Sequence, residues 1–317
     1  MITQRVIAID LGGTKLLGGV VDRDGVVVER VIKPTDTSSQ DALLAELDTL
    51  IGELMHDGVG AIGVGIPSTI DQRVGRAIAS VNIPLGELNF RDHLRSRFGL
   101  PAAIDNDANA ATLAEHRLGA GRGASHMIML TLGTGVGGGI IANGELYRGS
   151  VGAGAELGHI TVDVDGPPCQ GNCPGRGHLE ALASGTAADR LARKLAEERP
   201  EGDLGRAGAA GRTVDAKLAV ELAADGPGDA REAIDTIGFY LGIGIASLVN
   251  VFNPELVVLG GGFARAGDLL FEPARRVVAE RALAPQRDLA RVVPAILGVE
   301  AGLIGAGLVA FEALDRA

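Results

Sequence analysis

Short apolar runs rich in Val and Ile alternate along the chain with amphipathic stretches. Near the start, residues 6–10, 16–21 and 26–32 predict three strands, joined by a glycine turn and by the hairpin sequence DRDG. The same order of strand, glycine turn, strand, Asn-Gly turn and strand returns in HMIMLTLGTGVGGGIIANGELYRG. This repetition predicts a duplicated unit with one β-hairpin in each copy.

Helical periodicity fills the segments between and after the two copies. The stretch SSQDALLAELDTLIGELMHDG has serine at its expected N-cap, and the helix predicted in NFRDHLRSRFG ends at Gly99. A short strand runs into a helix in LPAAIDNDANAATLAEHRLGAG, and long apolar helices cover 229–254 and 301–317. Strands mixed with crossover helices indicate an α/β protein.

Composition narrows the class of protein. Apolar residues make up 46% of the chain and aromatic residues only 3%, so the core must be built from Val, Ile, Leu and Ala. No apolar run reaches the roughly 18 residues of a membrane span, and the first residues do not form a signal peptide. The formal charge of −11 argues against a nucleic-acid partner. We therefore expect a cytoplasmic protein with neither a nucleic-acid nor a membrane partner.

The first glycine turn has the chemistry of a phosphate site. In DLGGTK, Asp10 is followed by Gly12 and Gly13 and then by the hydroxyl of Thr14 and the cation of Lys15. Glycines tolerate φ > 0 and let backbone N–H groups approach an anion without a Cβ in the way. Mg²⁺ between the aspartate and a phosphate would remove their repulsion. Because another strand follows this turn, it is neither a Rossmann fingerprint nor a Walker P-loop.

Two further glycine turns repeat the pattern. LGTGVGGG, with Thr134 and Gly135, offers a second phosphate cradle. LGGGFA, with Gly261 and Gly262, offers a surface where a nucleoside could lie. For any one of the three turns, a glycine-rich turn without a ligand is the alternative interpretation.

The only two cysteines, Cys169 and Cys173, lie between His159 and His178. Two thiolates and two imidazoles form a possible zinc site, and the C-x₃-C spacing is compatible with it. The surrounding DGPPCQGNCPGRG is rich in Pro and Gly and has little capacity to order itself without a metal. A reducing cytosol argues against a disulfide. Two free thiols and two solvated histidines are the alternative.

The same motifs carry a family resemblance. The runs DLGGTK, LGTGVGGG and NPELVVLGGG resemble the phosphate and adenosine motifs of the superfamily of sugar kinases, actin and heat-shock ATPases. NDANAA (106–111), ELGH (156–159) and GHLEALASG (177–185) narrow the resemblance to the ROK family of sugar kinases and repressors, nearest to its glucokinases. It extends over essentially the whole chain.

This resemblance implies an α/β fold of the duplicated actin-like, ribonuclease H-like type, with two domains around a central cleft. We expect residues 1–118 plus 300–317 to form a small domain closed by the C-terminal helix. Residues 119–299 would form a large domain that carries the zinc loop. A homodimer or homotetramer is also implied.

The resemblance assigns roles to single residues. Asp107, where the strand AAID meets a helix, would be the base that orients the sugar hydroxyl and accepts its proton. From its position alone, helix capping is the alternative. One ring nitrogen of His159 would bind a structural Zn²⁺ while the other meets a sugar hydroxyl. The remaining sugar ligands would be Asn82, Asn106, Glu156 and Glu180.

The chain departs from the family pattern at two places. The family typically has C-x-C-G-x-x-G-C, whereas here the second cysteine is displaced and His178 replaces the third. Both substitutes are competent zinc ligands. In GAGAELGH, alanine stands directly before the glutamate, where the family more usually has glycine.

The implied function is the ATP- and Mg²⁺-dependent phosphorylation of glucose to glucose 6-phosphate, a step of glycolysis. A related kinase for fructose, mannose, allose or an N-acetylated hexosamine is the first alternative. A sugar-responsive repressor is a remote one, because such proteins begin with a helix-turn-helix and this chain begins on the first phosphate strand. Polyphosphate as donor is a further option, although such enzymes usually lack this zinc segment.

Overall fold

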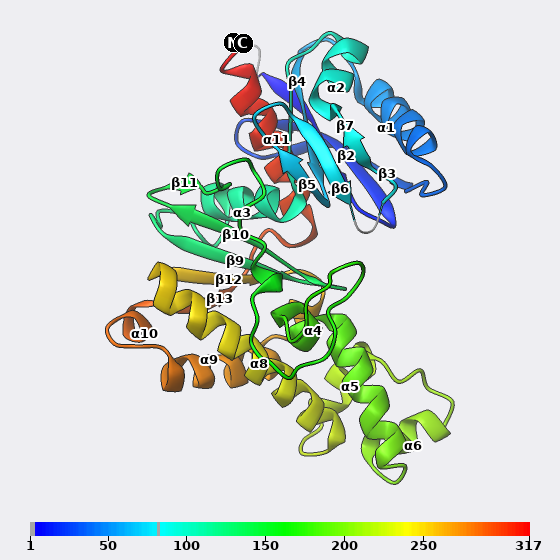
Figure 1. Cartoon of the computed structure of the whole chain (residues 1–317). Helices are drawn as coiled ribbons and strands as arrows, with labels where there is room; N and C mark the ends of the chain where they lie inside the picture. Colours follow the sequence, from blue (N-terminus) through cyan, green and yellow to red (C-terminus); the bar gives the residue numbers. More distant parts are fainter. Residues whose placement is uncertain (1–3, 81–82) are drawn as a thin grey trace. The chain divides into compact units, whose positions relative to one another are not determined.

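The structure is a computed structural model that describes residues 4–80 and 83–317 (Figure 1). The chain divides into two compact units. The first consists of Met1–Gly123, Gly139–Ala155 and Ile296–Ala317, and the second of Ala124–Gly138 and Glu156–Ala295. The domain boundaries expected from the sequence stay a prediction.

The first unit contains a five-stranded sheet in the order β3-β2-β1-β4-β8. The hairpins β1-β2 and β2-β3 are antiparallel, whereas β4 and β8 run parallel to β1. All three strands predicted at the start of the chain are confirmed. The strands are β1 (Arg5–Leu11), β2 (Lys15–Asp22), β3 (Val27–Pro34), β4 (Val59–Ile66) and β8 (Ala102–Asn106).

Apolar residues that alternate along the strands build a core on each face of this sheet. Ile7 and Ile9 pack on one face with α1 (Gln40–Leu54), while Val6 and Ala8 pack on the other with α11 (Ala301–Leu314). This follows from the two-residue period of a strand, which sends successive side chains to opposite faces.

Local signals place the helices of this unit where the sequence predicts them. The Ser39 hydroxyl caps α1 by accepting a hydrogen bond from the N–H of Ala42 at 3.1 Å. Gly99 ends α2 (Phe90–Phe98) with φ of 70°, which glycine adopts without strain. The next helix is α3 (Asp107–Leu118), directly after β8. A small antiparallel sheet that the sequence did not predict is formed by β5 (Ser68–Asp71), β6 (Arg76–Ser80) and β7 (Gly86–Leu88).

The second large sheet repeats the succession of strands in the first, in the order β11-β10-β9-β12-β13. Asn143 and Gly144, with φ of 55° and 78°, form the predicted Asn-Gly turn. The repetition confirms the predicted duplication. Its strands are β9 (Met127–Leu132), β10 (Val136–Ala142), β11 (Glu145–Leu146), β12 (Leu256–Gly260) and β13 (Arg291–Pro294).

The helices of the second unit surround α8 (Asp229–Phe252). By length and composition α8 could cross a membrane, but 56% of its most apolar window is buried. It packs against α4, α5, α7 and α9. Its neighbours are α4 (Leu179–Ala183), α5 (Gly185–Glu198), α6 (Asp203–Ala209), α7 (Ala216–Ala223), α9 (Asp268–Arg281) and α10 (Gln286–Leu289).

Candidate functional site

The DLGGTK turn joins β1 to β2 and is tightly folded. The Gly12 N–H donates to the Lys15 carbonyl at 3.0 Å, and the Thr35 hydroxyl donates to the Gly12 carbonyl at 2.6 Å. Gly13, Thr14 and Lys15 are exposed. Neither glycine has a positive φ, so this turn does not use the left-handed conformation that glycine tolerates. Limited space favours glycine at position 12 instead, because a Cβ there would lie 3.1 Å from the Lys15 carbonyl oxygen.

Asp10, at the end of β1, is a carboxylate in a confined place. Its carboxylate lies against the first turn of α11, where a Cβ on Gly302 would meet it. Burial, with a further contribution from the charge of Asp107, raises the pKa of Asp10 to about 7, although Lys15 opposes the shift. Such a carboxylate favours a nearby cation, because a cation stabilises its ionised form.

Asn106 and Asp107 share the junction between β8 and α3. The Asn106 side chain is the N-cap, and its oxygen accepts from the N–H groups of Ala108 at 2.9 Å and Asn109 at 3.2 Å. Its amide nitrogen therefore is the group left for another partner. Asp107 Oδ1 accepts from the Ala108 N–H at 2.8 Å. No other residue in the described part of the chain bonds its Oδ2.

Burial raises the pKa of Asp107, while hydrogen bonds from the backbone of Ala108 and of Asp107 itself oppose the rise. A carboxyl group with a raised pKa is a stronger base than an ordinary aspartate. Asn106 thus provides most of the helix cap, which was the alternative role for Asp107. One carboxylate oxygen of Asp107 remains available to act as a base.

An ion pair next to this junction was not predicted. Asp105 is 1% exposed, and its carboxylate accepts from Arg148 Nε at 2.7 Å and from Asn109 Nδ2 at 3.1 Å. The pair positions the residue that precedes Asn106. In the sequence, Asp105 stood out only as a single acid after the apolar residues of its strand. Its partner could not be identified there, because Arg148 lies 43 residues away.

The second glycine turn contacts a residue that the sequence assigned to the sugar. The Val136 N–H donates to Glu180 Oε2 at 2.9 Å. A Cβ on Gly135 would collide with this carboxylate. The turn is further tied to α5, because the Thr186 hydroxyl donates to the Thr134 carbonyl at 2.8 Å. Gly135 therefore leaves room for Glu180, and its φ is not positive.

The third turn follows β12. Gly261 has φ of 89°, and a Cβ there would collide with the Leu132 carbonyl. Gly262 faces open space. The positive φ and the close Leu132 carbonyl thus require glycine at position 261. The space beside Gly262 is free for a ligand.

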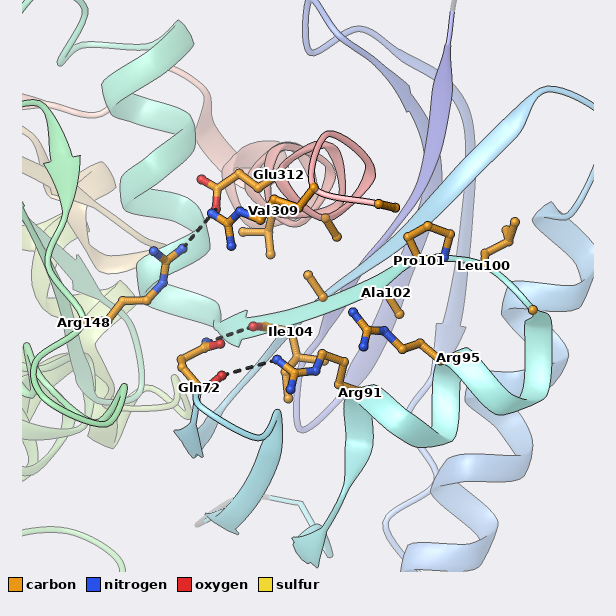
Figure 2. A pocket seen from close by; sticks show the side chains of 15 residues that line it. Gln72, Arg91, Arg95, Leu100, Pro101, Ala102, Ile104, Arg148, Val309 and Glu312 are labelled. Carbon is orange, nitrogen blue, oxygen red and sulfur yellow. Dashed lines mark hydrogen bonds and ion pairs between the residues drawn. The ribbon is translucent and has the colours of Figure 1, made fainter.

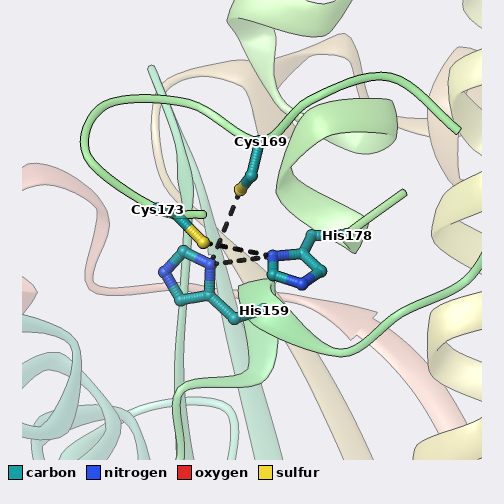
Figure 3. Close-up of side chains that lie close together, drawn as sticks. All are labelled: His159, Cys169, Cys173 and His178. Atoms are coloured by element: carbon teal, nitrogen blue, oxygen red, sulfur yellow. Dashed lines mark hydrogen bonds between the residues drawn. The ribbon is translucent and has the colours of Figure 1, made fainter. Parts of the chain in front are cut away.

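The four predicted zinc ligands converge (Figure 3). Their donor atoms all lie within 4.8 Å of one another. His159 Nδ1 lies 3.3 Å from His178 Nδ1 and 3.6 Å from Cys169 Sγ, and Cys173 Sγ lies 3.5 Å from His178 Nδ1. Tetrahedral zinc bonds of about 2.05 Å to nitrogen and 2.3 Å to sulfur require separations of about 3.3 and 3.6 Å. The donor set therefore fits a zinc ion.

The surroundings of Cys169 disfavour its thiolate in the metal-free protein. Burial, reinforced by Cys173 and Glu180, raises the pKa of Cys169 to about 11, with a backbone hydrogen bond from Gln170 opposing it. Without a cation this thiol would stay protonated at neutral pH. Both histidines turn Nδ1 toward the cluster, so Nε2 of His159 points elsewhere (Figure 3).

The loop that carries the cysteines has more backbone order than its composition indicates. The Cys169 N–H donates to the Gly175 carbonyl at 2.9 Å, and the Gly177 N–H donates to the Pro167 carbonyl at 2.8 Å. Gln170, to which the sequence gave no role, donates to the Ser184 hydroxyl at 2.8 Å. The loop is thus a bonded hairpin whose two sides bring the cysteines beside the histidines.

Glu156 lies at the start of a short 3₁₀ turn, Leu157–His159. The residue before it, Ala155, has φ of 66°. Alanine rarely adopts this left-handed conformation. The departure noted in GAGAELGH therefore falls where the backbone favours glycine.

The predicted residues thus form two groups, one in each unit. Asn82 lies outside the described residues. The first unit holds Asp10, Gly12, Gly13, Thr14, Lys15, Asn106 and Asp107, and the second holds Thr134, Gly135, Glu156, His159, Cys169, Cys173, His178, Glu180, Gly261 and Gly262.

Comparison with known proteins shows which family has this sequence pattern. The model of the ROK family matches residues 6–313. A glucokinase of Thermotoga maritima is 35% identical over 97% of this chain and 98% of its own length. A putative xylose repressor of a Caldicellulosiruptor species is 33% identical over 95% of this chain but only 76% of its own length.

Among solved structures, a ROK family glucokinase from Streptomyces griseus in complex with glucose and AMPPNP is 33% identical. It superimposes with a TM-score of 0.83 over 97% of this chain and 99% of the other. The predicted α/β fold of the duplicated actin-like type is confirmed. The family match over nearly the full length, together with these identities, leads to one conclusion: this chain belongs to the ROK family.

Proposed function

We propose that this protein transfers the γ-phosphoryl group of ATP to the 6-hydroxyl of glucose, giving glucose 6-phosphate and ADP. The observation that carries the proposal is the pair of aspartates in the first unit. Asp107 keeps one carboxylate oxygen that no other described residue bonds, and it lies near enough to Asp10 to raise the pKa of that carboxyl. A base beside a cation-binding carboxylate is what transfer of a phosphoryl group to an alcohol requires.

Asp107 orients the 6-hydroxyl and accepts its proton as the oxygen attacks the γ-phosphorus. The amide nitrogen of Asn106 donates to a neighbouring sugar hydroxyl, since the amide oxygen is used by the helix cap. Asp10 would hold the Mg²⁺ that accompanies ATP, and that ion would supply charge neutralisation on the phosphates. The exposed turn Gly12–Lys15 contributes backbone N–H groups, a hydroxyl and an ammonium group to the same phosphates.

In the second unit, the turn at Thr134–Gly135 receives phosphate oxygens, and the free space beside Gly262 receives the nucleoside. Glu156, Glu180 and Nε2 of His159 bind sugar hydroxyls, because carboxylates accept pairs of hydrogen bonds from neighbouring hydroxyls. Asn82 is proposed as a further sugar ligand.

The proposed metal of the second unit is a structural Zn²⁺ bound by His159, Cys169, Cys173 and His178. The tetrahedral donor separations support it. All four positions are filled by protein, so the ion holds the sugar-binding residues in place and activates no water.

We place the enzyme in the cytoplasm, in glycolysis, as a homodimer or homotetramer. Another hexose as acceptor is the second candidate. A coupled assay of ADP release with ATP and a panel of sugars tests both. Glucose should give the highest kcat/KM. A clearly higher value for fructose or N-acetylmannosamine would make the glucose assignment wrong, and no turnover with any sugar would contradict the kinase assignment.

A further inference from the structure

A cavity of about 650 Å³ lies in the first unit, alongside β8, the edge strand of the first sheet. Its volume is in the range of small-ligand sites. Its wall comes from α2, from β8 and from α11, with Gln72 and Arg148 at one end (Figure 2). None of the residues assigned to the kinase reaction lines it.

The lining is cationic in a chain whose net charge is −11. Four arginines face one glutamate, Glu312, in the described lining. Arg148 is paired with Asp105 and Arg316 with Glu312, so the excess positive charge comes from the other two arginines. The four are Arg91, Arg95, Arg148 and Arg316.

Two of these arginines lack a carboxylate partner. Arg91 donates to the carbonyls of Gln72 at 3.3 Å and Arg73 at 3.5 Å, and its buried Nε has no hydrogen-bond partner in the part of the chain that the structure describes. No described group binds the guanidinium of Arg95. Positions 91 and 95 lie on one face of α2, where like charges repel. A bound anion would relieve this repulsion.

The side chain of Arg91 is also held in place. Arg91 packs over Gly75, where a Cβ would meet its side chain, and its N–H donates to the Gly75 carbonyl at 3.1 Å. Figure 2 shows Arg91 and Arg95 reaching from α2 to the same side of β8, with Glu312 on the other side. A guanidinium fork that is held in this way matches the oxygens of phosphate in paired hydrogen bonds, and the exposed Arg95 can add a second cation.

We propose that this cavity is a second binding site, for a small anion that carries one or two phosphate groups. Inorganic phosphate, pyrophosphate and a sugar phosphate share this chemistry. The site is independent of the zinc loop and of the glycine turns, and it does not depend on the proposed kinase reaction.

Arg148 is unsuitable as a test variant, since its loss would leave the buried Asp105 without its cation. Arg95→Gln is preferable, because Arg95 is exposed and makes no internal contact that folding requires. The double variant Arg91→Gln/Arg95→Gln removes both free cations. Arg97→Gln is the matched control on the same helix, because Arg97 pairs with Asp48 at 3.2 Å and does not line the cavity.

Titration calorimetry at low ionic strength, with inorganic phosphate, pyrophosphate and glucose 6-phosphate as separate arms, measures the site. Binding of these anions to the kinase site is the same in wild type and in the three variants. A difference in affinity between them therefore measures binding to the cavity. For the tightest anion, we expect at least about fivefold weaker binding in Arg95→Gln, at least about tenfold in the double variant, and less than about twofold change in Arg97→Gln. Equal affinities in all four proteins, or no binding to wild type, would overturn the proposal. The arm whose affinity falls most in the double variant identifies the source of the phosphate.

Discussion

The surroundings of a single residue can affect both its binding chemistry and the stability of the protein, as Asp10 shows. Burial and Asp107 raise its pKa from 3.8 to about 7, so an acid at the end of a strand becomes a group that titrates near neutrality. The same confinement that would make it a good cation ligand makes its charge costly when no cation is bound.

This predicts how stability depends on pH. Between pH 4 and 7 the folded protein retains a proton on Asp10 that the unfolded chain has lost, so the free energy of unfolding falls as the pH rises through that window. Asp10→Asn should therefore stabilise the metal-free protein at pH 8 by up to about 4 kcal/mol, and by clearly less at pH 5. Urea unfolding at both pH values measures it, with the exposed Asp57→Asn as control. The same effect of Asp10→Asn at pH 5 and pH 8 would refute the assignment.

Gly135 has a second role that residue type alone could not indicate. Because a Cβ there meets Glu180, Gly135→Ala should displace a proposed sugar ligand as well as narrow the phosphate turn. We expect the KM values for ATP and for glucose both to rise at least about tenfold. Gly52→Ala, on α1 away from the proposed site, where an added Cβ meets no atom within 4 Å, is the control and should change neither value. Wild-type KM values in Gly135→Ala would show that Glu180 tolerates the methyl group.

Among the helices and strands, those determined by residues close together in the sequence could be predicted, and contacts between distant segments could not. The first hairpins, α1, α2 and the β8–α3 junction were predictable because caps and turn residues act over a few positions, as Ser39 and Gly99 do. The sheet β5-β6-β7 was missed, since its short strands depend on pairing with each other. The pair Asp105–Arg148 and the contact between Gly135 and Glu180 join distant segments, so one sequence contains no sign of them.

One element junction retains a strained conformation that can be relieved. Ala155, with φ of 66°, precedes the turn that presents Glu156. Ala155→Gly should raise the free energy of unfolding by roughly 0.5–1 kcal/mol, because glycine avoids the left-handed penalty of alanine. The matched Ala45→Gly, in the exposed interior of α1, should lower it by about 1 kcal/mol. Denaturant titration distinguishes them, and destabilisation by both substitutions would contradict the strain.

For the whole molecule, the duplicated succession of strands supplies the scaffold, and the cysteine-histidine loop is an addition to it. The donor atoms of that loop all lie within 4.8 Å of one another, and three of their separations match those of a zinc tetrahedron. The four ligands were predictable from residue type and spacing. The backbone hydrogen bonds of the loop were not, because Pro- and Gly-rich composition conceals pairing between its two sides.

Metal analysis tests the loop. We predict one Zn²⁺ per chain, and Cys173→Ser or chelation should sharply weaken sugar binding while nucleotide affinity changes little. Gln170→Ala is a control that alters the loop and leaves the four ligands intact. Fewer than about 0.2 zinc ions per chain, in fully active protein never exposed to chelator, would return the cysteines to free thiols.

The central claim is that Asp107 is the base of an ATP-dependent glucose kinase. The most direct measurement compares kcat of Asp107→Asn with that of wild type, alongside the affinity of each protein for glucose. The substitution removes the proton acceptor but keeps the size of the side chain, so kcat should fall at least about 100-fold while glucose still binds. A kcat within about threefold of wild type would contradict the assignment of Asp107 as the base.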